Sequence, residues 1–587
     1  MSHQLKKNLG VTFHHNATEF RVWAPFAKSV SITVPYISYD ISNATPMESE
    51  GDGYWSLTRK DVEPGQTYKF LIDTGSEVLR RNDPRGRALT ASNDGDSVIV
   101  APTFEWHDTN FQARPLNEQI LYELHVGTFN RRDPASQGTF FDAIEKLDYL
   151  RDLGITAVEL MPITSMLNST GWGYNTISIF AVESSYGGRR GLMEFVDACH
   201  ARGISAILDL VYNHFYGGTD LWQFDGWHEN GRGGIYFYND PRGDTPWGSR
   251  PDYGRPEVRQ YILDNITMWL QEYHVDGFRL DSTIYMRNTA GNDDPATNIP
   301  DAWSLLQEIS TLAHEIKPGA LLIAEDDAST SAIVDPVDIG GCGFDAQWQL
   351  NFSRCLRGEL GVTTAYSGNF YSELTTQYGN SPYHRVIFSD SHDTAANGYA
   401  RINTATSEDN PTSKIAQQKT LVANAAALTA NGTPMLLQGI EFLQSGDFNE
   451  WNELEWQKTE SLPGLVDAHR HIIALRHNKY GNTAGLLGMA QEILHQNEQN
   501  HVVAYRRWDK GGKRDDTVVI LNLGDSAFES YQLRFPARGT WRIRFNSTWK
   551  GYSREFKETA IDTVIVGKDC LATVPLAPYA VYIFSQD

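Results

Sequence analysis

The sequence predicts an α/β protein built on a (β/α)8 barrel, with a β-sandwich domain on each side of the barrel. Short runs of alternating apolar and polar residues, typical of strands, occupy both ends of the 587-residue chain. Between them, apolar runs alternate with helical patterns over about 360 residues, as in parallel βαβ units. Since one domain of this size carries eight such runs, a TIM barrel is favoured over a doubly wound sheet.

The first domain is expected at residues 1–112, as a small β-sandwich. Its predicted strands are 19–23, 29–34, 54–57, 68–72 and 96–100. Turn sequences rich in Gly, Pro, Asn and Asp separate them, among them residues 51–53 and 82–86. Short strands at this regular spacing are typical of a sandwich.

The barrel is expected at residues 113–482. Its predicted strands are 120–126, 155–161, 204–211, 275–280, 320–324, 344–347, 386–389 and 434–437. Helical periodicity is present at 144–153, 192–201, 258–273, 305–316, 415–429 and 465–476. The segment 212–250 follows the third strand, is rich in Gly and aromatic residues and has no period, so we expect a functional loop at the barrel mouth.

The third domain is expected at residues 483–587, as a second β-sandwich. Its predicted strands are 501–505, 517–521, 540–545 and 579–584. They have the strand-like composition of the first domain, which places the barrel between two sandwiches.

Composition narrows the classes of function. The 73 acidic and 50 basic residues give a net charge of −23, which argues against binding to nucleic acids or to anionic membranes. The chain has no apolar run that could span a membrane and no apolar segment near its N-terminus of the kind found in secretory signals. The four cysteines are scattered, which predicts free thiols in a reducing, cytoplasmic compartment and no zinc site. Most of the Trp, Tyr and Phe residues, 12% of the chain, are expected in packing, and the remainder favour a surface that stacks sugars.

Polar residues gather where the predicted barrel strands end. They are Glu123 and His125 (first strand), Trp172 and Tyr174 (after the second), Asp209, Asn213 and His214 (third), Arg279 and Asp281 (fourth), Glu325, Asp326 and Asp327 (fifth), and His392 and Asp393 (seventh). Each alone has an ordinary structural explanation, such as a helix cap or an ion pair. Together they place several carboxylates at one rim, which costs stability and is typical of a catalytic site.

Two carboxylates in an aromatic cleft suit glycoside hydrolysis or transfer, in which one attacks the anomeric carbon and the other protonates the leaving oxygen. Asp281 is the expected nucleophile, because Arg279 lies two residues away on the same strand face and would keep it ionised. Glu325 follows an apolar run that would raise its pKa, so it is the expected acid. Asp393 is the expected third carboxylate, with His392 and His214 as hydrogen-bond donors to sugar hydroxyls.

Four blocks resemble the α-amylase superfamily, glycoside hydrolase family 13. They are DLVYNHF at 209–215, DGFRLD at 276–281, IAED at 323–326 and SHD at 391–393. The resemblance implies Asp281 as nucleophile, Glu325 as acid/base and Asp393 as transition-state stabiliser. It also implies that the glucosyl unit is surrounded by Arg279, Asp209, His214 and His392, with Tyr174 stacked beneath it. Trp172, in the same GWGYN segment, is a second expected sugar platform. FRVWAPFAKSVSI, from residue 20, resembles a glucan-binding N-terminal module of branching and debranching enzymes.

The subgroup stays open between two resemblances. Residues 439–456 and the NSTWKGYS segment at 546–553 are similar to glycogen branching enzymes. YELHVGTF at 122–129 and the region ending in VYNHF are similar to maltooligosyltrehalose trehalohydrolase. In some amylases the Asn of VYNH ligates calcium, so Asn213 is a candidate ligand. Because Ca²⁺ takes six to eight oxygens and no further ligands can be assembled, we expect no metal or other cofactor.

Three functions are compatible with these observations. The first is a 1,4-α-glucan branching enzyme of glycogen-type metabolism, which cleaves α-1,4 bonds and transfers the chain to make α-1,6 branches. The second is a hydrolase of α-1,4 bonds, of α-amylase or trehalohydrolase type, and the third is a non-catalytic glucan-binding protein. An α-glucan or maltooligosaccharide is the expected partner, with no prediction of oligomeric state. Six aromatics of the 212–250 loop are candidates for an acceptor site or for packing within the loop, namely Trp222, Trp227, Tyr236, Phe237, Tyr238 and Trp247.

Overall fold

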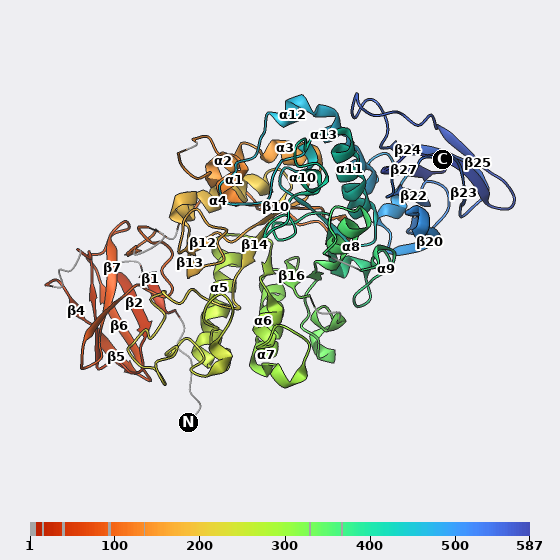
Figure 1. The fold of residues 1–587 in the computed structure, drawn as a ribbon. Coiled ribbons are helices and arrows are strands. Elements are labelled where there is room, and N and C mark those ends of the chain that lie inside the picture. Colours follow the sequence, from red (N-terminus) through yellow and green to blue (C-terminus); the bar gives the residue numbers. More distant parts are fainter. Residues whose placement is uncertain are drawn as a thin grey trace.

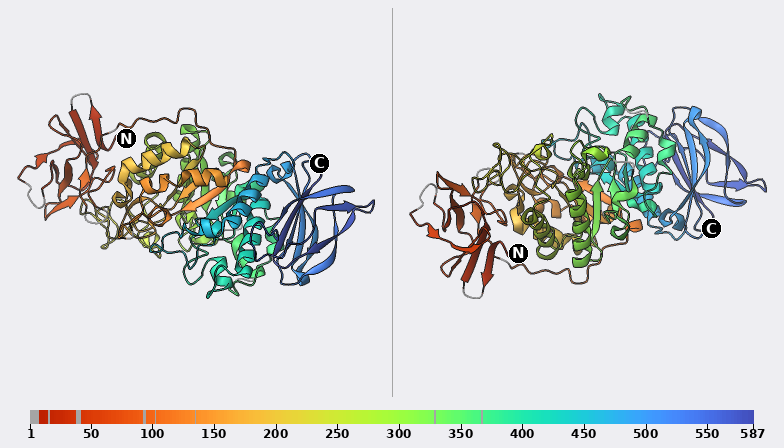
Figure 2. Two further views of the ribbon diagram at one scale, coloured as in Figure 1. Left: turned by 90° about the horizontal axis from the view of Figure 1, so that it is seen from above. Right: turned by 90° about the horizontal axis from the view of Figure 1, so that it is seen from below.

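The computed structural model describes residues 8–587 apart from 15–16, 38–41, 92–94, 102, 134, 328–329 and 366–367. Residues 1–7 lie outside the described residues. They are part of the N-terminal segment in which no secretory signal was predicted. Figures 1 and 2 show three units in a row, with a β-rich domain at each end of a central α/β barrel. The predicted fold class is therefore confirmed.

The N-terminal domain is a sandwich of two antiparallel sheets. One sheet has the order β1-β2-β6-β5, and the other has the order β4-β3-β7-β8 with β9 paired to β7. Its strands are β1 (Gly10–His14), β2 (Ala17–Trp23), β3 (Ser29–Thr33), β4 (Thr45–Pro46), β5 (Glu48–Gly51), β6 (Tyr54–Arg59), β7 (Thr67–Asp73), β8 (Val78–Arg81) and β9 (Ser97–Val98). The five predicted strands are present, and four were missed, β1, β4, β5 and β8. The missed strands β4, β5 and β8 are short and largely exposed, so they lack the alternation that reveals a half-buried strand.

The central domain is a closed barrel of eight parallel strands in chain order. Its strands are β10 (Leu121–Leu124), β11 (Ala157–Leu160), β14 (Ser205–Leu210), β15 (Gly277–Leu280), β16 (Leu321–Glu325), β17 (Ala346–Trp348), β18 (Arg385–Phe388) and β19 (Thr433–Leu437). All eight were predicted. They could be read from sequence because almost every residue in them is buried, which produces continuous apolar runs rather than alternation.

Helices surround the barrel and connect its strands (Figure 1). They are α1 (Val126–Phe129), α2 (Phe140–Ile144), α3 (Leu147–Leu153), α4 (Gly188–His200), α5 (Pro256–Glu272), α6 (Thr283–Arg287), α7 (Pro300–Ile316), α8 (Asn351–Glu359), α9 (Phe370–Glu373), α10 (Ile402–Thr406), α11 (Lys414–Thr429), α12 (Lys458–Ser461) and α13 (Pro463–Arg476). An antiparallel hairpin, β12 (Thr164–Met166) and β13 (Thr176–Val182), is inserted after β11. The hairpin was not predicted, nor were the helices α1, α6, α8, α9, α10 and α12, and α2 was predicted only at its last residue.

The C-terminal domain has its own hydrophobic core. A six-stranded sheet of order β20-β21-β22-β27-β24-β25 lies beside the pair β23-β26. The strands are β20 (Ala490–Asn497), β21 (Val502–Trp508), β22 (Thr517–Asn522), β23 (Phe528–Arg534), β24 (Gly539–Asn546), β25 (Thr563–Val566), β26 (Leu571–Leu576) and β27 (Ala580–Ser585). Buried Arg507 connects this domain to the barrel, because its guanidinium donates to the Thr429 carbonyl at 2.7 Å.

The loop 212–250 connects the barrel to the N-terminal domain. Arg81 of β8 donates to the carbonyls of Phe224 (2.9 Å) and Gln223 (3.0 Å). Phe26 stacks on Trp227 with ring centroids 4.7 Å apart and an angle of 8° between the planes. The loop is therefore part of a domain interface as well as part of the barrel mouth.

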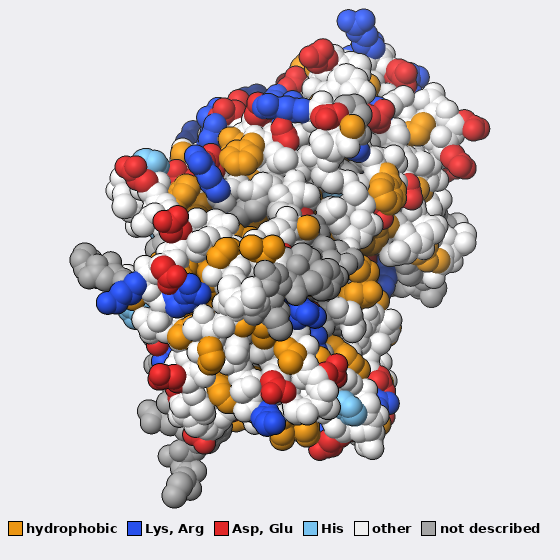
Figure 3. Space-filling view, turned by 90° about the vertical axis from the view of Figure 1, so that its left-hand side faces the viewer, with side chains coloured by type: hydrophobic (Ala, Val, Ile, Leu, Met, Phe, Trp, Pro, Cys, Tyr) orange, Lys and Arg blue, Asp and Glu red, His pale blue; other side chains and the backbone are white. Residues whose placement is uncertain are grey.

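Charges of both signs are mixed on one face of the molecule. On the face in Figure 3, Lys and Arg side chains are interspersed with Asp and Glu side chains. None of the helices in the described part of the chain is both long enough and apolar enough to span a membrane.

Candidate active site

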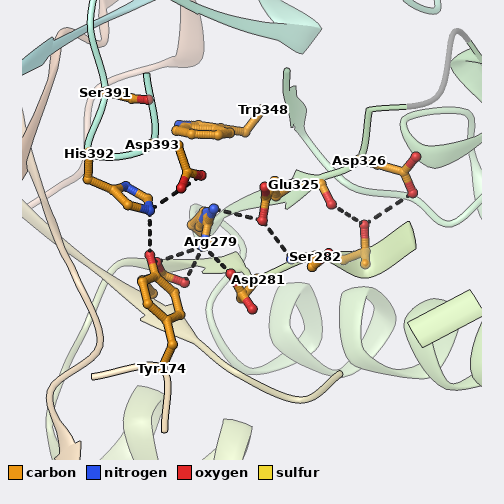
Figure 4. Close-up of polar contacts among 12 residues, drawn as sticks. Tyr174, Arg279, Asp281, Ser282, Glu325, Asp326, Trp348, Ser391, His392 and Asp393 are labelled. Carbon is orange, nitrogen blue, oxygen red and sulfur yellow. Dashed lines mark hydrogen bonds and ion pairs between the residues drawn. The ribbon is translucent and has the colours of Figure 1, made fainter. Parts of the chain in front are cut away.

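Predicted site residues from several strands meet at the carboxyl ends of the barrel strands. Figure 4 shows Tyr174, Arg279, Asp281, Glu325, His392 and Asp393 close together there. Parallel pairing aligns Asp209 on β14 with Arg279 on β15. It also aligns Glu325, the last residue of β16, with Trp348 on β17. Asp281 follows β15 directly, so the two predicted catalytic carboxylates come from adjacent strands, as expected.

Arg279 connects three of these carboxylates. Its side chain is 1% exposed, and its guanidinium lies 2.7 Å from Asp209, 2.9 Å from Asp281 and 2.8 Å from Glu325. Trp348 lies against the guanidinium, with the ring centroid 4.9 Å from its carbon. A buried cation with this many anionic partners stays charged, and the pKa of Arg279 is raised far above its usual value because Asp209 and Glu325 outweigh the effect of burial.

Glu325 has a protonation state suited to an acid. Its carboxylate accepts a 2.7 Å hydrogen bond from the backbone N–H of Ser282. Ser282 has a φ of 41° and a ψ of 56°, a left-handed conformation that costs a non-glycine residue about 1–3 kcal/mol and occurs often at functional sites. Burial, with Asp281 and Asp393 nearby, raises the pKa of Glu325 to about 8, although Arg279 opposes the shift.

His392 is held from behind by Glu123 on β10. The Glu123 carboxylate accepts from the His392 backbone N–H at 2.9 Å and also pairs with its Nδ1. Nε2 of the same ring faces the Asp393 carboxylate at 3.5 Å and the Tyr174 hydroxyl at 3.0 Å. Burial would lower the pKa of His392, but Asp393 and Glu123 raise it to about 10, so the ring is a cation that donates from both nitrogens.

Tyr174 lies on the loop between β12 and β13. Its hydroxyl donates to Asp209 at 2.7 Å. Its ring stacks on His392 at 5.5 Å with an angle of 24° between the planes. Burial raises the pKa of Asp209 to about 6 and that of Tyr174 well above its usual value. These contacts fix the aromatic face at the bottom of the cleft.

The cleft has a volume of about 320 Å³. Its lining contains seven of the nine predicted site residues, Trp172, Tyr174, His214, Asp281, Glu325, His392 and Asp393. The other two, Asp209 and Arg279, lie beneath it and contact the lining residues. The structure thus brings all nine into one site.

Three residues with roles here were not among the predicted site residues. Trp348 carries no charge and lies within a strand, so nothing in the sequence distinguishes it from core. Glu123 is one of the polar residues of the first strand, but its partner His392 is 269 residues away along the chain, so the sequence does not connect the two. Ser282 acts through its backbone, which a side-chain motif does not reveal.

Of the two roles predicted for the six aromatics of the 212–250 loop, packing is the one that the structure shows for five of them. Tyr236, Phe237 and Tyr238 are buried, and Trp222 and Trp227 are partly buried against the core. These five side chains pack the loop, the interior and the domain interface. Only Trp247 of the six lines the cleft, where it is 48% exposed and lies 5.7 Å from the His214 ring.

The Asn213 side chain makes polar contacts with two predicted site residues, Asp281 and His214. Its amide donates to the Asp281 backbone carbonyl at 2.8 Å and to the Asp281 carboxylate at 2.6 Å, and its oxygen faces the His214 Nδ1. Among the described residues no group of three or more His, Cys, Asp or Glu side chains is arranged to hold a metal ion. Through these contacts the Asn213 side chain positions Asp281 and His214.

A closed (β/α)8 barrel whose rim joins three carboxylates to one buried arginine has the acidic groups that a carbohydrate-active enzyme needs to break a glycosidic bond. The α-amylase catalytic domain matches residues 124–246 and 249–462. The α-amylase C-terminal all-β domain matches 493–587, and carbohydrate-binding module 48, the isoamylase N-terminal domain, matches 8–86. The chain belongs to the α-amylase family.

Curated relatives match over different lengths. The chain is 29% identical over 571 residues to the 1,4-alpha-glucan branching enzyme GlgB of Corynebacterium jeikeium, which covers 93% of this chain and 78% of that protein. It is 33% identical over 373 residues to the malto-oligosyltrehalose trehalohydrolase of Saccharolobus solfataricus. This match covers 62% of this chain and 59% of that protein.

Solved structures share the fold over the whole chain. A pullulanase of Anoxybacillus sp. LM18-11 complexed with maltotetraose superimposes with a TM-score of 0.78 at 20% identity, covering 100% of this chain and 88% of that one. The type I pullulanase of Bacillus subtilis complexed with maltose superimposes with a TM-score of 0.75 at 20% identity. The match covers 99% of this chain and 86% of that one. At this identity the likeness concerns the three-domain fold alone.

Proposed function

We propose that the protein is a retaining α-glucan-active enzyme, and specifically a 1,4-α-glucan branching enzyme. The observation that carries the proposal is the match to a branching enzyme through 93% of the chain, which includes both β-domains as well as the barrel. Further branching enzymes match at comparable identity, such as that of Pseudoalteromonas atlantica at 29% over 570 residues.

In the first step the Asp281 carboxylate attacks the anomeric carbon of a glucosyl unit in the cleft. Glu325, protonated at neutral pH, gives its proton to the glycosidic oxygen as the bond breaks, which leaves a covalent glucosyl–Asp281 intermediate. Arg279 keeps Asp281 ionised, because its guanidinium lies 2.9 Å from that carboxylate.

In the second step Glu325, now ionised, takes the proton from an acceptor hydroxyl, which attacks the anomeric carbon and frees Asp281. A 6-hydroxyl of another glucan chain gives an α-1,6 branch, and water gives a reducing end. Asp393 and the His392 cation border the same cleft and are the groups expected to bind hydroxyls of the reacting sugar.

Trp247 supports transfer to a sugar acceptor. Its ring is 48% exposed at the edge of the cleft and is held edge-on by Tyr285 at 4.8 Å. An exposed ring that is fixed in place can stack on an acceptor sugar and exclude water from the intermediate.

A second candidate is hydrolysis of a maltooligosaccharide, with or without a terminal trehalose. It is favoured by the 33% identity to the trehalohydrolase, the higher of the two identities, although this match covers 62% of the chain.

Incubation of the protein with amylose distinguishes the branching function from the hydrolytic one. We expect new α-1,6 anomeric signals in the proton NMR spectrum without a matching increase in reducing ends. Reducing ends without branches would contradict the branching proposal, and trehalose released from maltooligosyl trehalose would assign the second function.

A further inference from the structure

A second aromatic cavity lies where α13 of the barrel meets the end of β24 and the segment after it. Its volume is about 860 Å³, within the range of ligand sites. It is lined by His471, Phe545, Trp549, Tyr552, Glu558 and Asp562 among others, and none of its residues lines the catalytic cleft. The mechanism above uses none of these side chains.

Trp549 presents an open aromatic face. The side chain is 48% exposed, although a tryptophan is normally among the well-buried residues. The opposite side of its ring rests on Gly551, where an added Cβ would lie only 2.4 Å from the ring atoms. Its edge meets Tyr552 at 4.9 Å with the planes at 87°. The ring is therefore held in one orientation with a free face.

The support beneath Trp549 is itself fixed. Tyr552 stacks on Phe545 at 5.3 Å, and its hydroxyl is hydrogen-bonded to His471 Nδ1 at 2.6 Å. Burial lowers the pKa of His471, so the ring is neutral at physiological pH. Tyr480, which is 56% exposed, lies outside the cavity lining and packs edge-on against His471, with the two ring centroids 5.9 Å apart.

Polar groups without protein partners border the aromatic floor. The exposed carboxylates of Glu558 and Asp562 line the cavity and form no ion pair or side-chain hydrogen bond within the described part of the chain. Free carboxylates accept hydrogen bonds from hydroxyls and repel phosphates. Arg544 also lines the cavity, but its guanidinium is paired with Asp587. Together with the net charge of −23, the two carboxylates favour a neutral polyhydroxyl ligand over a nucleic acid.

We propose that this cavity is a secondary binding site for an α-glucan chain, with Trp549 as its stacking platform. The proposal rests on the α-glucan substrate of the proposed function, and it adds a contact that short oligosaccharides held in the cleft do not make. Loss of the site should therefore weaken binding of a branched polymer while leaving turnover of a short maltooligosaccharide unchanged.

The test uses full-length protein carrying Asp281→Asn, which prevents turnover, and hydrogen–deuterium exchange with maltoheptaose. We expect protection both at the cleft (residues 172–175 and 391–397) and at residues 543–562. Adding Trp549→Ala should abolish the second protection, keep the first, and weaken binding to amylopectin in affinity gels about tenfold. Ile565→Ala, 78% exposed on the same domain and outside the cavity, is the matched control and should change neither.

A second variant guards against misfolding. The double change Glu558→Gln and Asp562→Asn removes the charges without touching the aromatic floor, and it should also reduce protection at 543–562. Cleft protection without protection at 543–562 in the parent protein would overturn this inference alone. Protection at neither place would overturn the α-glucan substrate as well. A dimer that protects 543–562 in the absence of sugar would assign the cavity to a second copy of the chain and would also overturn the inference.

Discussion

The protonation of Glu325 should determine the alkaline limit of activity. Its pKa is raised from 4.5 to about 8, which corresponds to a cost of about 5 kcal/mol for the ionised form in the folded protein. The acid is therefore almost fully protonated at pH 6 and about one-tenth protonated at pH 9. We expect kcat/KM on amylose to fall about tenfold per pH unit above pH 8, since this quantity reports on the free enzyme.

Glu325→Gln gives the decisive comparison. On amylose, loss of the acid should lower activity by about 10²–10⁴-fold and remove the alkaline limb. Maltosyl fluoride has a leaving group that needs no proton, so the variant should still release fluoride rapidly in its first turnover, which a stopped-flow fluoride assay measures. Asp281→Asn is the matched control, because without the nucleophile neither substrate reacts.

Two results would refute this assignment. One is an equal loss of first-turnover rate on both substrates in Glu325→Gln, which would mean that Glu325 does not act on the leaving oxygen. The other is an alkaline limb that persists unchanged in the variant, which would assign the titration to a different group.

Three further outcomes are expected. Asp281→Asn should abolish turnover on amylose while the melting temperature stays close to that of the parent, and parent-like activity would exclude the nucleophile role. Trp247→Ala should shift products from branches to reducing ends, as read by NMR and a reducing-end assay, while an unchanged ratio would remove Trp247 from the acceptor side. Buried Glu159 has a pKa raised to about 8 by burial and Glu123, above the unfolded value near 4.5, so its effect on stability becomes less favourable as the pH rises between these values. Glu159→Gln should therefore gain melting temperature relative to the parent from pH 5 to pH 8 and then level off, and a gain that is independent of pH would contradict the shift.

The sequence predicted the barrel and the rim carboxylates well because both follow from local patterns. Buried parallel strands are apolar throughout, and a charged residue such as Asp281 or Glu325 immediately after one stands out. Parallel topology then brings those positions to one edge regardless of their separation along the chain. The clustering of Asp209, Arg279 and Asp281 was thus a geometric consequence of the predicted fold.

The other features of the site could not be predicted, because they depend on tertiary packing that local sequence patterns do not indicate. The sequence does not distinguish the six loop aromatics, yet Phe237 is fully buried against Phe215 and Trp222, and Trp247 is half exposed beside His214. This difference depends on how the loop folds back on the barrel. Glu123 could be connected with His392 only once the register of the barrel was known. The exposed Trp549 ring, which packs on Gly551, can likewise be recognised only once the fold of the backbone is known.

The interface made by the 212–250 loop has a consequence for truncation of the protein. The N-terminal domain covers Trp227 with Phe26 and anchors the loop through Arg81, and the same loop ends beside the cleft at Trp247. A shortened chain that begins at residue 113 would lose these anchors and expose apolar surface. Such a fragment is expected to aggregate and to lose activity even on short substrates, as light scattering and an assay on a maltooligosaccharide would show.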